Sequence, residues 1–141
     1  MKENNYEALI PNRIFVGGVD GVEPLLENEQ MDVIFDLRVA SIEHPAENIK
    51  VHQPILDGQE QQDDSIKAAV HEVVQAYKNG KNVYFHCTSG GGRAGTMAVA
   101  TLMELNLADS VEEAEVKAKA IRSKINLKED QRESLKRIYS K

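Results

Sequence analysis

Cysteine is nearly absent from the sequence, which has one such residue, Cys87, among 141. A single cysteine excludes an intrachain disulfide framework and a cysteine-rich zinc site. Long hydrophobic runs are also missing, because no segment approaches the roughly 18 consecutive apolar residues of a membrane span. No apolar stretch follows Lys2, as one would in a signal peptide. We therefore expect a cytoplasmic protein, in whose reducing environment the thiol stays free.

An excess of positive charge is missing too. The chain has 17 Lys and Arg against 23 Asp and Glu, for a net charge of −6. Nucleic-acid-binding proteins are more often basic, so we expect no nucleic-acid partner, and no membrane partner. Residues 117–141 depart from this balance with nine Lys and Arg against three Asp and Glu. We interpret them as the solvated faces of two terminal helices rather than as a docking surface.

The length and the apolar pattern indicate a single α/β domain over residues 1–141. A chain of this length buries enough apolar surface to form its own core. Strands alternate with helices, which predicts layers around a mainly parallel central sheet. Strands are expected over 13–18, 31–38 and 81–86, and helices over 21–29, 64–79, 93–106, 110–121 and 128–139. A further extended stretch is expected over 49–56, where Pro54 favours a strand end.

Several of these helices carry signals at their ends. Asp63 or Asp64 is expected to cap the helix over 64–79, and Gly80 to stop it. Ser110 and Glu113 have the spacing of a capping box. The helix over 93–106 is apolar on nearly all sides, which is typical of a central, buried helix.

One segment, residues 86–96 with the sequence HCTSGGGRAGT, has the composition of a reactive anion-binding loop. It joins a predicted strand to a predicted helix, at the edge of the sheet where α/β proteins bind ligands. Its glycines allow backbone amides to converge on an anion, and the helix adds the positive end of its dipole. Arg93 adds a planar fork for two phosphate oxygens. These positive groups should favour the thiolate of Cys87, which would then be a nucleophile suited to attack phosphorus.

Two other kinds of glycine-rich loop fit less well. A nucleotide-binding P-loop of the Walker type needs a lysine that this segment lacks. Gly90, Gly92 and Gly95 match the dinucleotide fingerprint formally, but the acidic residue expected about 20 positions later would fall in a helix.

The Cys-x5-Arg spacing from Cys87 to Arg93, with His86 before it, resembles the signature of the protein tyrosine phosphatase superfamily. Over roughly residues 9–139 the chain looks like the small dual-specificity branch. The resemblance implies a three-layer α/β fold, with four to five strands flanked by helices. It also implies a phosphatase that hydrolyses phosphomonoesters through a phosphocysteine, without cofactor or metal, on a phosphorylated protein or small phosphomonoester. The phosphate-binding residues would be Thr88, Ser89, Gly90, Gly91, Gly92 and Arg93, with His86 and Thr96 in support.

The resemblance also asks for a general acid about thirty residues before the cysteine. Asp57 lies thirty positions before Cys87, directly after an extended stretch, and is the first candidate. Asp63 and Asp64 are the alternatives. Asp36 and Arg38 are interpreted as polar residues at a strand end that pair with each other, and Arg38 is an additional candidate to reach the phosphate.

Two features depart from the usual pattern of the family. Ala94 stands where most members have a serine or threonine whose hydroxyl helps the thiolate to leave, although the phosphatases of regenerating liver also have alanine there. Slow breakdown of the phosphocysteine is therefore expected. Three consecutive glycines, Gly90 to Gly92, predict a loop that is loose without an anion. The alternatives are a phosphate-binding pseudo-phosphatase module or, with less support, a sulfurtransferase or an arsenate reductase.

Overall fold

A computed structural model describes residues 5–39, 49–56 and 58–139, and its described strands form one mixed sheet. The strands are β1 (Tyr6–Ile10), β2 (Ile14–Gly18), β3 (Val33–Asp36), β4 (Lys50–His52) and β5 (Val83–Cys87). Their order across the sheet is β1-β2-β5-β3-β4. Strand β5, which leads into the glycine-rich loop, therefore lies at the centre of the sheet.

The prediction of a mainly parallel sheet of four to five strands is confirmed. Strands β2 and β3 both pair with β5 in parallel, and β4 pairs with β3 in parallel. Only β1 is antiparallel, and the sequence interpretation missed it. Its residues are mostly half-buried at the sheet edge, so they lack the apolar run that marks the central strands. A tight turn at Asn12, with φ of 68°, returns the chain into β2.

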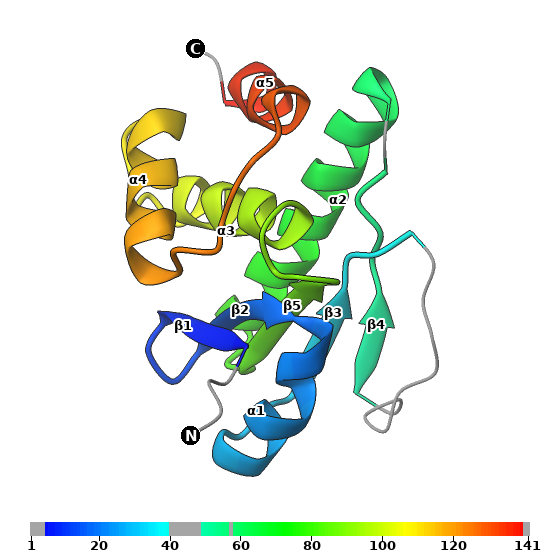
Figure 1. Ribbon diagram of the computed structural model, residues 1–141, viewed down its shortest axis with the longest axis vertical. Coiled ribbons are helices and arrows are strands. Elements are labelled where there is room, and N and C mark those ends of the chain that lie inside the picture. The colour runs from blue at the N-terminus through cyan, green and yellow to red at the C-terminus, as the bar shows by residue number, and fades with distance from the viewer. Residues whose placement is uncertain (1–4, 40–48, 57, 140–141) are drawn as a thin grey trace.

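The helices complete a three-layer arrangement, as expected (Figure 1). Helix α1 (Val22–Asn28) covers one face of the sheet, where Val22 and Leu25 pack with Phe15 and Tyr84. The other face is covered by α2 (Gln59–Lys78), α3 (Arg93–Glu104) and α4 (Val111–Ile121), and α5 (Glu129–Ile138) packs on these three helices. Helix α3 lies between α2 and α4 and contacts α5 as well.

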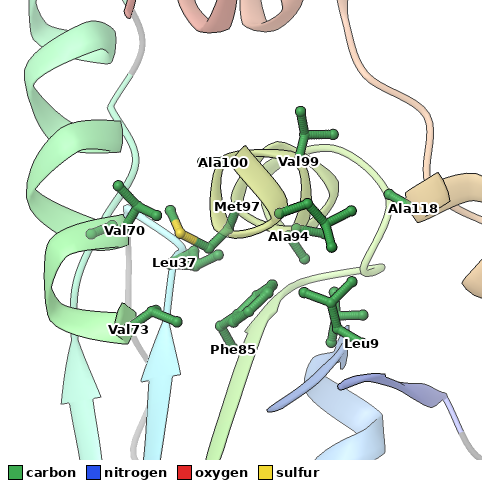
Figure 2. Packing of buried hydrophobic residues seen from close by; sticks show 14 of the residues in the cluster. Leu9, Leu37, Val70, Val73, Phe85, Ala94, Met97, Val99, Ala100 and Ala118 are labelled. Atoms are coloured by element: carbon green, nitrogen blue, oxygen red, sulfur yellow. The ribbon is translucent and has the colours of Figure 1, made fainter. Parts of the chain in front are cut away.

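The main core lies between β5 and α3 (Figure 2). Phe85 points from β5 toward Ala94 and Met97 of α3, with Val73 of α2 on one side and Leu9 of β1 on the other. All residues from Ala94 to Leu102 are buried, which confirms the prediction of a central α3. Because α3 is packed on all sides, the position of its first residue, Arg93, is fixed relative to the end of β5.

The two ends of α2 test the predicted cap and the predicted stop of this helix. The prediction that Asp63 or Asp64 caps α2 is wrong, because α2 begins at Gln59 after Gly58, and Asp63 pairs with Arg137 instead. Gly80 follows α2 with a φ of 85°, in agreement with its predicted role as a stop. Among the described residues, no helix combines the length and the apolar character required to cross a membrane.

The capping box before α4 forms in part. The hydroxyl of Ser110 accepts a hydrogen bond from the backbone N–H of Glu113 at 3.1 Å, as predicted. The carboxylate of Glu113 returns to the N–H of Asp109 rather than to that of Ser110. The helix start is therefore capped by the predicted residue, and the reciprocal bond shifts by one position.

Candidate active site

The alternation of side chains along β5 places Cys87 on the face of the sheet that α3 covers. Val83, Phe85 and Cys87 belong to the main core, whereas Tyr84 packs in the cluster beneath α1. The chain leaves β5 at Cys87 and enters α3 at Arg93. The predicted loop thus lies at the carboxyl end of the central strand, directly before a helix N-terminus.

Two backbone amides of this loop point at the Cys87 sulfur. The N–H of Gly90 donates to Sγ at 3.2 Å, and the N–H of Ala94 donates to it at 3.5 Å. The positive φ of Gly90, 83°, is a conformation that residues with a side chain rarely adopt. Cys87 itself is buried, with 6% of its surface exposed. Two amide N–H groups thus direct the positive ends of their dipoles at Sγ.

The loop borders an open cavity of about 200 Å³. Five of the residues around it were predicted as site residues, and Lys128 and Gln131 were not. The lining residues are Cys87, Thr88, Ser89, Gly92, Arg93, Lys128 and Gln131. Gln131 is buried with 4% exposure, and its Oε1 accepts a hydrogen bond from the N–H of Lys128 at 2.9 Å. Both residues belong to the start of α5, and no local motif in the sequence connects this segment to the loop.

Arg93 joins the loop to the extended segment that precedes α2. Its Nε donates to the carbonyl oxygen of Ile55 at 2.8 Å. The next residue, Leu56, donates its N–H to the hydroxyl of Ser65 at 2.9 Å. Segment 55–56 is therefore held beside the loop at one side and against α2 at the other.

Of the three predicted acid candidates, the first, Asp57, lies outside the described residues. Its described neighbours Leu56 and Gly58 flank it in the segment just discussed. Asp63 forms a bidentate ion pair with Arg137, at 2.8 and 2.9 Å, and the hydrogen bond from Arg137 holds the pKa of this carboxyl below its ordinary value. A carboxyl in that state is a poor proton donor at neutral pH. Asp64 is exposed on α2.

Asp36 and Arg38 pair with each other, as predicted. Arg38 donates to both carboxylate oxygens of Asp36, at 2.9 and 2.8 Å, and Lys50 Nζ lies 3.6 Å away. Asp36 is fully buried, and burial alone would raise its pKa. The hydrogen bonds from Arg38, with the nearby charge of His86, instead hold the pKa of Asp36 well below its ordinary value. Among the described residues, those that line the cavity do not include Arg38.

The two predicted supporting residues lie on opposite ends of the loop. His86 is buried, stacks on Tyr84, and has its Nδ1 3.3 Å from the carbonyl oxygen of Cys87. Thr96 donates from both its N–H and its hydroxyl to the carbonyl oxygen of Gly92, at 2.9 and 2.8 Å. Each residue thus contacts the backbone at one boundary of the loop.

The basic C-terminal region differs from the solvated faces that the sequence suggested. Arg122 is buried with 1% exposure, and Arg132 pairs with Glu115 and Glu129. Several of these charges therefore serve contacts inside the fold. A cavity of about 470 Å³ beside Arg122 is lined by Tyr6, Glu7, Ala120, Ile121, Arg122, Ser123 and Lys124, and by no residue of the loop. Within the described ranges, no cluster of His, Cys, Asp and Glu is suited to hold a metal ion.

Comparison with protein families agrees with this site. Residues 18–107 match the family "Polymorphic toxin system, DSP-PTPase phosphatase", in which DSP-PTPase denotes the dual-specificity and tyrosine phosphatases. The match includes the whole loop and most of the chain, so the protein belongs to this family and is a phosphatase. Among curated proteins, none matches the chain.

Solved structures show the same fold at low sequence identity. A putative mouse dual-specificity phosphatase, solved with zinc tungstate, has a TM-score of 0.81 at 15% identity, over 97% of this chain and 87% of that one. Human DUSP28 has a TM-score of 0.81 at 16% identity, over 97% and 94%. PTPMT1 in complex with PI(5)P has a TM-score of 0.76 at 20% identity, over 95% and 94%. The expected dual-specificity phosphatase-like fold is thereby confirmed.

Proposed function

We propose that the protein hydrolyses phosphomonoesters through a phosphocysteine formed on Cys87. The observation that carries the proposal is the convergence of the N–H groups of Gly90 and Ala94 on Sγ, at the floor of a cavity that Arg93 also lines. Such a thiolate faces the place where a phosphoryl group would be held by amides and a guanidinium. The proposal treats residues 1–141 as one phosphatase-like domain.

In the first step, the Cys87 thiolate attacks phosphorus in line with the ester oxygen. The S–P bond forms while the P–O bond to the leaving group breaks. Arg93 and the amides of residues 88–93 stabilise the equatorial oxygens as charge shifts among them. The leaving oxygen takes a proton, for which Asp57 is the proposed donor.

In the second step, water attacks the phosphocysteine. The proposed Asp57 carboxylate accepts a proton from the water, the S–P bond breaks, and the thiolate returns as inorganic phosphate leaves. No redox partner or metal enters this balance. The placement of Ile55 beside Arg93 supports Asp57, because it brings the chain to the loop two residues before the acid.

The proposed substrate is a phosphorylated protein or a small phosphomonoester. PTPMT1, which shares the fold, was solved with a phosphoinositide. A cytoplasmic location is also part of the proposal, because a reducing compartment would keep Cys87 available as a thiol.

The test compares wild-type protein with Cys87→Ser on p-nitrophenyl phosphate. We expect turnover in the wild type and none above background in the variant, while inorganic phosphate still binds to the variant. Since the chain has one cysteine, acid quenching during turnover should trap a single phosphoryl group, detectable by intact mass, on Cys87 alone.

Three results separate the alternatives. Equal turnover by Cys87→Ser would contradict the proposal. Phosphopeptide binding by a wild-type protein that hydrolyses nothing would identify a binding module. Activity on thiosulfate or arsenate in place of phosphate esters would identify one of the other cysteine enzymes.

A further inference from the structure

The carbonyl groups of the loop all have hydrogen-bond donors outside the cavity. The carbonyl of Thr88 accepts from the N–H of Val19 at 3.2 Å, and that of Gly92 accepts from Thr96. Between them, the carbonyls of Ser89, Gly90 and Gly91 all accept from the segment 122–126, which follows α4. An amide group places its N–H and C=O in opposite directions, so carbonyls fixed outward direct the amides of this loop inward.

Arg122 makes the central contacts of this set. Its Nε donates to the carbonyl of Gly90 at 3.0 Å, and its Nη2 donates to the carbonyl of Ser89 at 2.9 Å. The N–H of Asn126 completes the set by donating to the carbonyl of Gly91 at 2.9 Å. A guanidinium can donate along two parallel directions from one rigid plane, which suits two successive carbonyls.

The guanidinium of Arg122 is in turn fixed from its far side. Its Nη1 donates to the Glu7 carboxylate at 2.6 Å, and its Nη2 also donates to the side-chain oxygen of Asn5. Both partners belong to the N-terminal edge of the sheet. With 99% of its surface buried and acceptors on both sides, the side chain has little freedom to rotate.

We propose that Arg122 is a positioning residue that holds the phosphate-binding loop in its binding conformation before a phosphate arrives. The inference rests on the proposed function, because it assigns the order of this loop to its use as a phosphate site. Three consecutive glycines would otherwise leave the loop many conformations to lose on binding. The bonds from Arg122 remove that freedom in advance, which strengthens binding by lowering its entropic cost.

The test replaces Arg122 with lysine, which keeps the charge and loses the planar fork. One ammonium cannot reach the Ser89 carbonyl, the Gly90 carbonyl and Glu7 together. We expect inorganic phosphate to bind the Arg122→Lys variant about tenfold more weakly, equivalent to the loss of one charged hydrogen bond. Alkylation of Cys87 by iodoacetamide near neutral pH should slow in the same variant, and added phosphate should protect it less. Calorimetry and intact mass provide these readouts.

The matched control is Arg132→Lys. Arg132 also binds two carboxylates, those of Glu115 and Glu129, and it does not line the cavity beside the loop. The Arg132→Lys variant should bind phosphate and react with iodoacetamide as the wild type does. A purely structural role for Arg122 would lower the melting temperature of Arg122→Lys and leave both readouts of the folded protein unchanged, and that result would overturn the inference.

If Arg122→Lys fails to fold, the Asn5→Ala variant tests the inference in its place. It removes a neutral acceptor of the same guanidinium from the partly exposed side, and we expect phosphate affinity to fall by about threefold, less than a full hydrogen bond. Unchanged affinity there would overturn the inference. None of these measurements needs turnover. A protein whose phosphate affinity depends on Arg122 but which hydrolyses no ester would contradict the proposed function and leave the inference standing.

Discussion

The inner and outer sides of the proposed phosphate-binding loop differ in where their residues come from. The inner side is local, since Cys87, the amides of Gly90 and Ala94, and Arg93 lie within eight consecutive residues. The outer side is assembled from distant segments, because Arg122 contacts Gly90 across 32 positions and Glu7 across 115. The inner side contains the proposed reacting groups, and the outer side holds the carbonyls of the loop. The Cys-x5-Arg motif therefore contains the groups of the inner side, whereas the residues that hold the outer side lie elsewhere in the chain.

Gly90 and Gly92 offer the sharpest comparison of the two sides of the loop, because the same substitution meets different neighbours at each. A Cβ added at Gly90 would lie 2.5 Å from Arg122 Nη2 and 2.6 Å from the backbone of Gly17, at a φ of 83°. A Cβ added at Gly92 would face Gln131 at 3.5 Å, an ordinary contact. We expect Gly90→Ala to lower the free energy of unfolding by about 4 kcal/mol through strain and overpacking. Gly92→Ala should change it by less than about 1 kcal/mol, as measured by urea denaturation.

Equal stability of these two variants would contradict the assignment of Gly90 to the crowded outer side. The comparison uses the same substitution two residues apart, at a buried position with a positive φ and at a half-buried position without one.

A buried ion pair between Asp36 and Arg38 lies beside the loop, and replacing Asp36 tests its contribution to stability. Asp36 lies opposite His86 in the pairing of β3 with β5 and is held by Arg38. Asp36→Asn should lower the free energy of unfolding by about 3 kcal/mol at pH 7, because it breaks a buried charge pair. The pKa of Asp36 is lowered in the folded state, so its stabilisation is complete above the ordinary value of 3.8 and is lost as the pH falls through the folded value.

The difference between wild type and Asp36→Asn should therefore shrink when urea denaturation is repeated below that ordinary value. Asp64→Asn, which alters an exposed carboxylate on α2, is the control and should match the wild type at both pH values. A difference that stays constant across this range would mean that the charge of Asp36 contributes nothing.

The proposed acid, Asp57, should affect rate alone. Asp57→Asn should lower kcat on an alkyl phosphate by about 100-fold, a typical contribution of general acid catalysis. The loss should be smaller with p-nitrophenyl phosphate, whose leaving group needs little protonation. Asp63→Asn is the matched control, because its carboxylate is engaged by Arg137. A larger loss in Asp63→Asn than in Asp57→Asn would reassign the acid.

The smallest effect is expected at Ala94. Its N–H donates to Sγ, but its methyl group provides no second donor to the departing thiolate. Ala94→Ser should raise kcat by about threefold, within the range of one neutral hydrogen bond, if hydrolysis of the phosphocysteine limits turnover. Trapped phosphocysteine should decrease in the variant. Equal amounts of the trapped intermediate in both proteins would place the limiting step elsewhere.

Local signals explain what could be predicted from the sequence. The apolar β5, the all-apolar α3, the loop between them and the pair Asp36–Arg38 all depend on residues close together in the chain, and each prediction was confirmed in position. Strand β1 escaped because a half-buried edge strand has no strong apolar pattern. The start of α2 at Gln59 escaped because Asp63 resembles a cap but serves an ion pair with α5.

The residues that were missed at the site share one property. Arg122, Lys128 and Gln131 reach the loop only through the packing of α4 and α5, and a polar residue in a basic helical region looks solvent-exposed in sequence. Their contacts depend on tertiary structure, which composition and spacing do not encode.

The distance along the chain between the loop and Arg122 also sets an order of events in biosynthesis. A ribosome makes Cys87 and the glycines well before Arg122, which contacts Gly90 across 32 residues. The chain up to Gly92 thus exists before the segment 122–126, whose donors hold the carbonyls of the loop. The observed arrangement of the loop can form only once Arg122 has been made and has packed against it, and synthesis of the signature motif alone does not produce that arrangement.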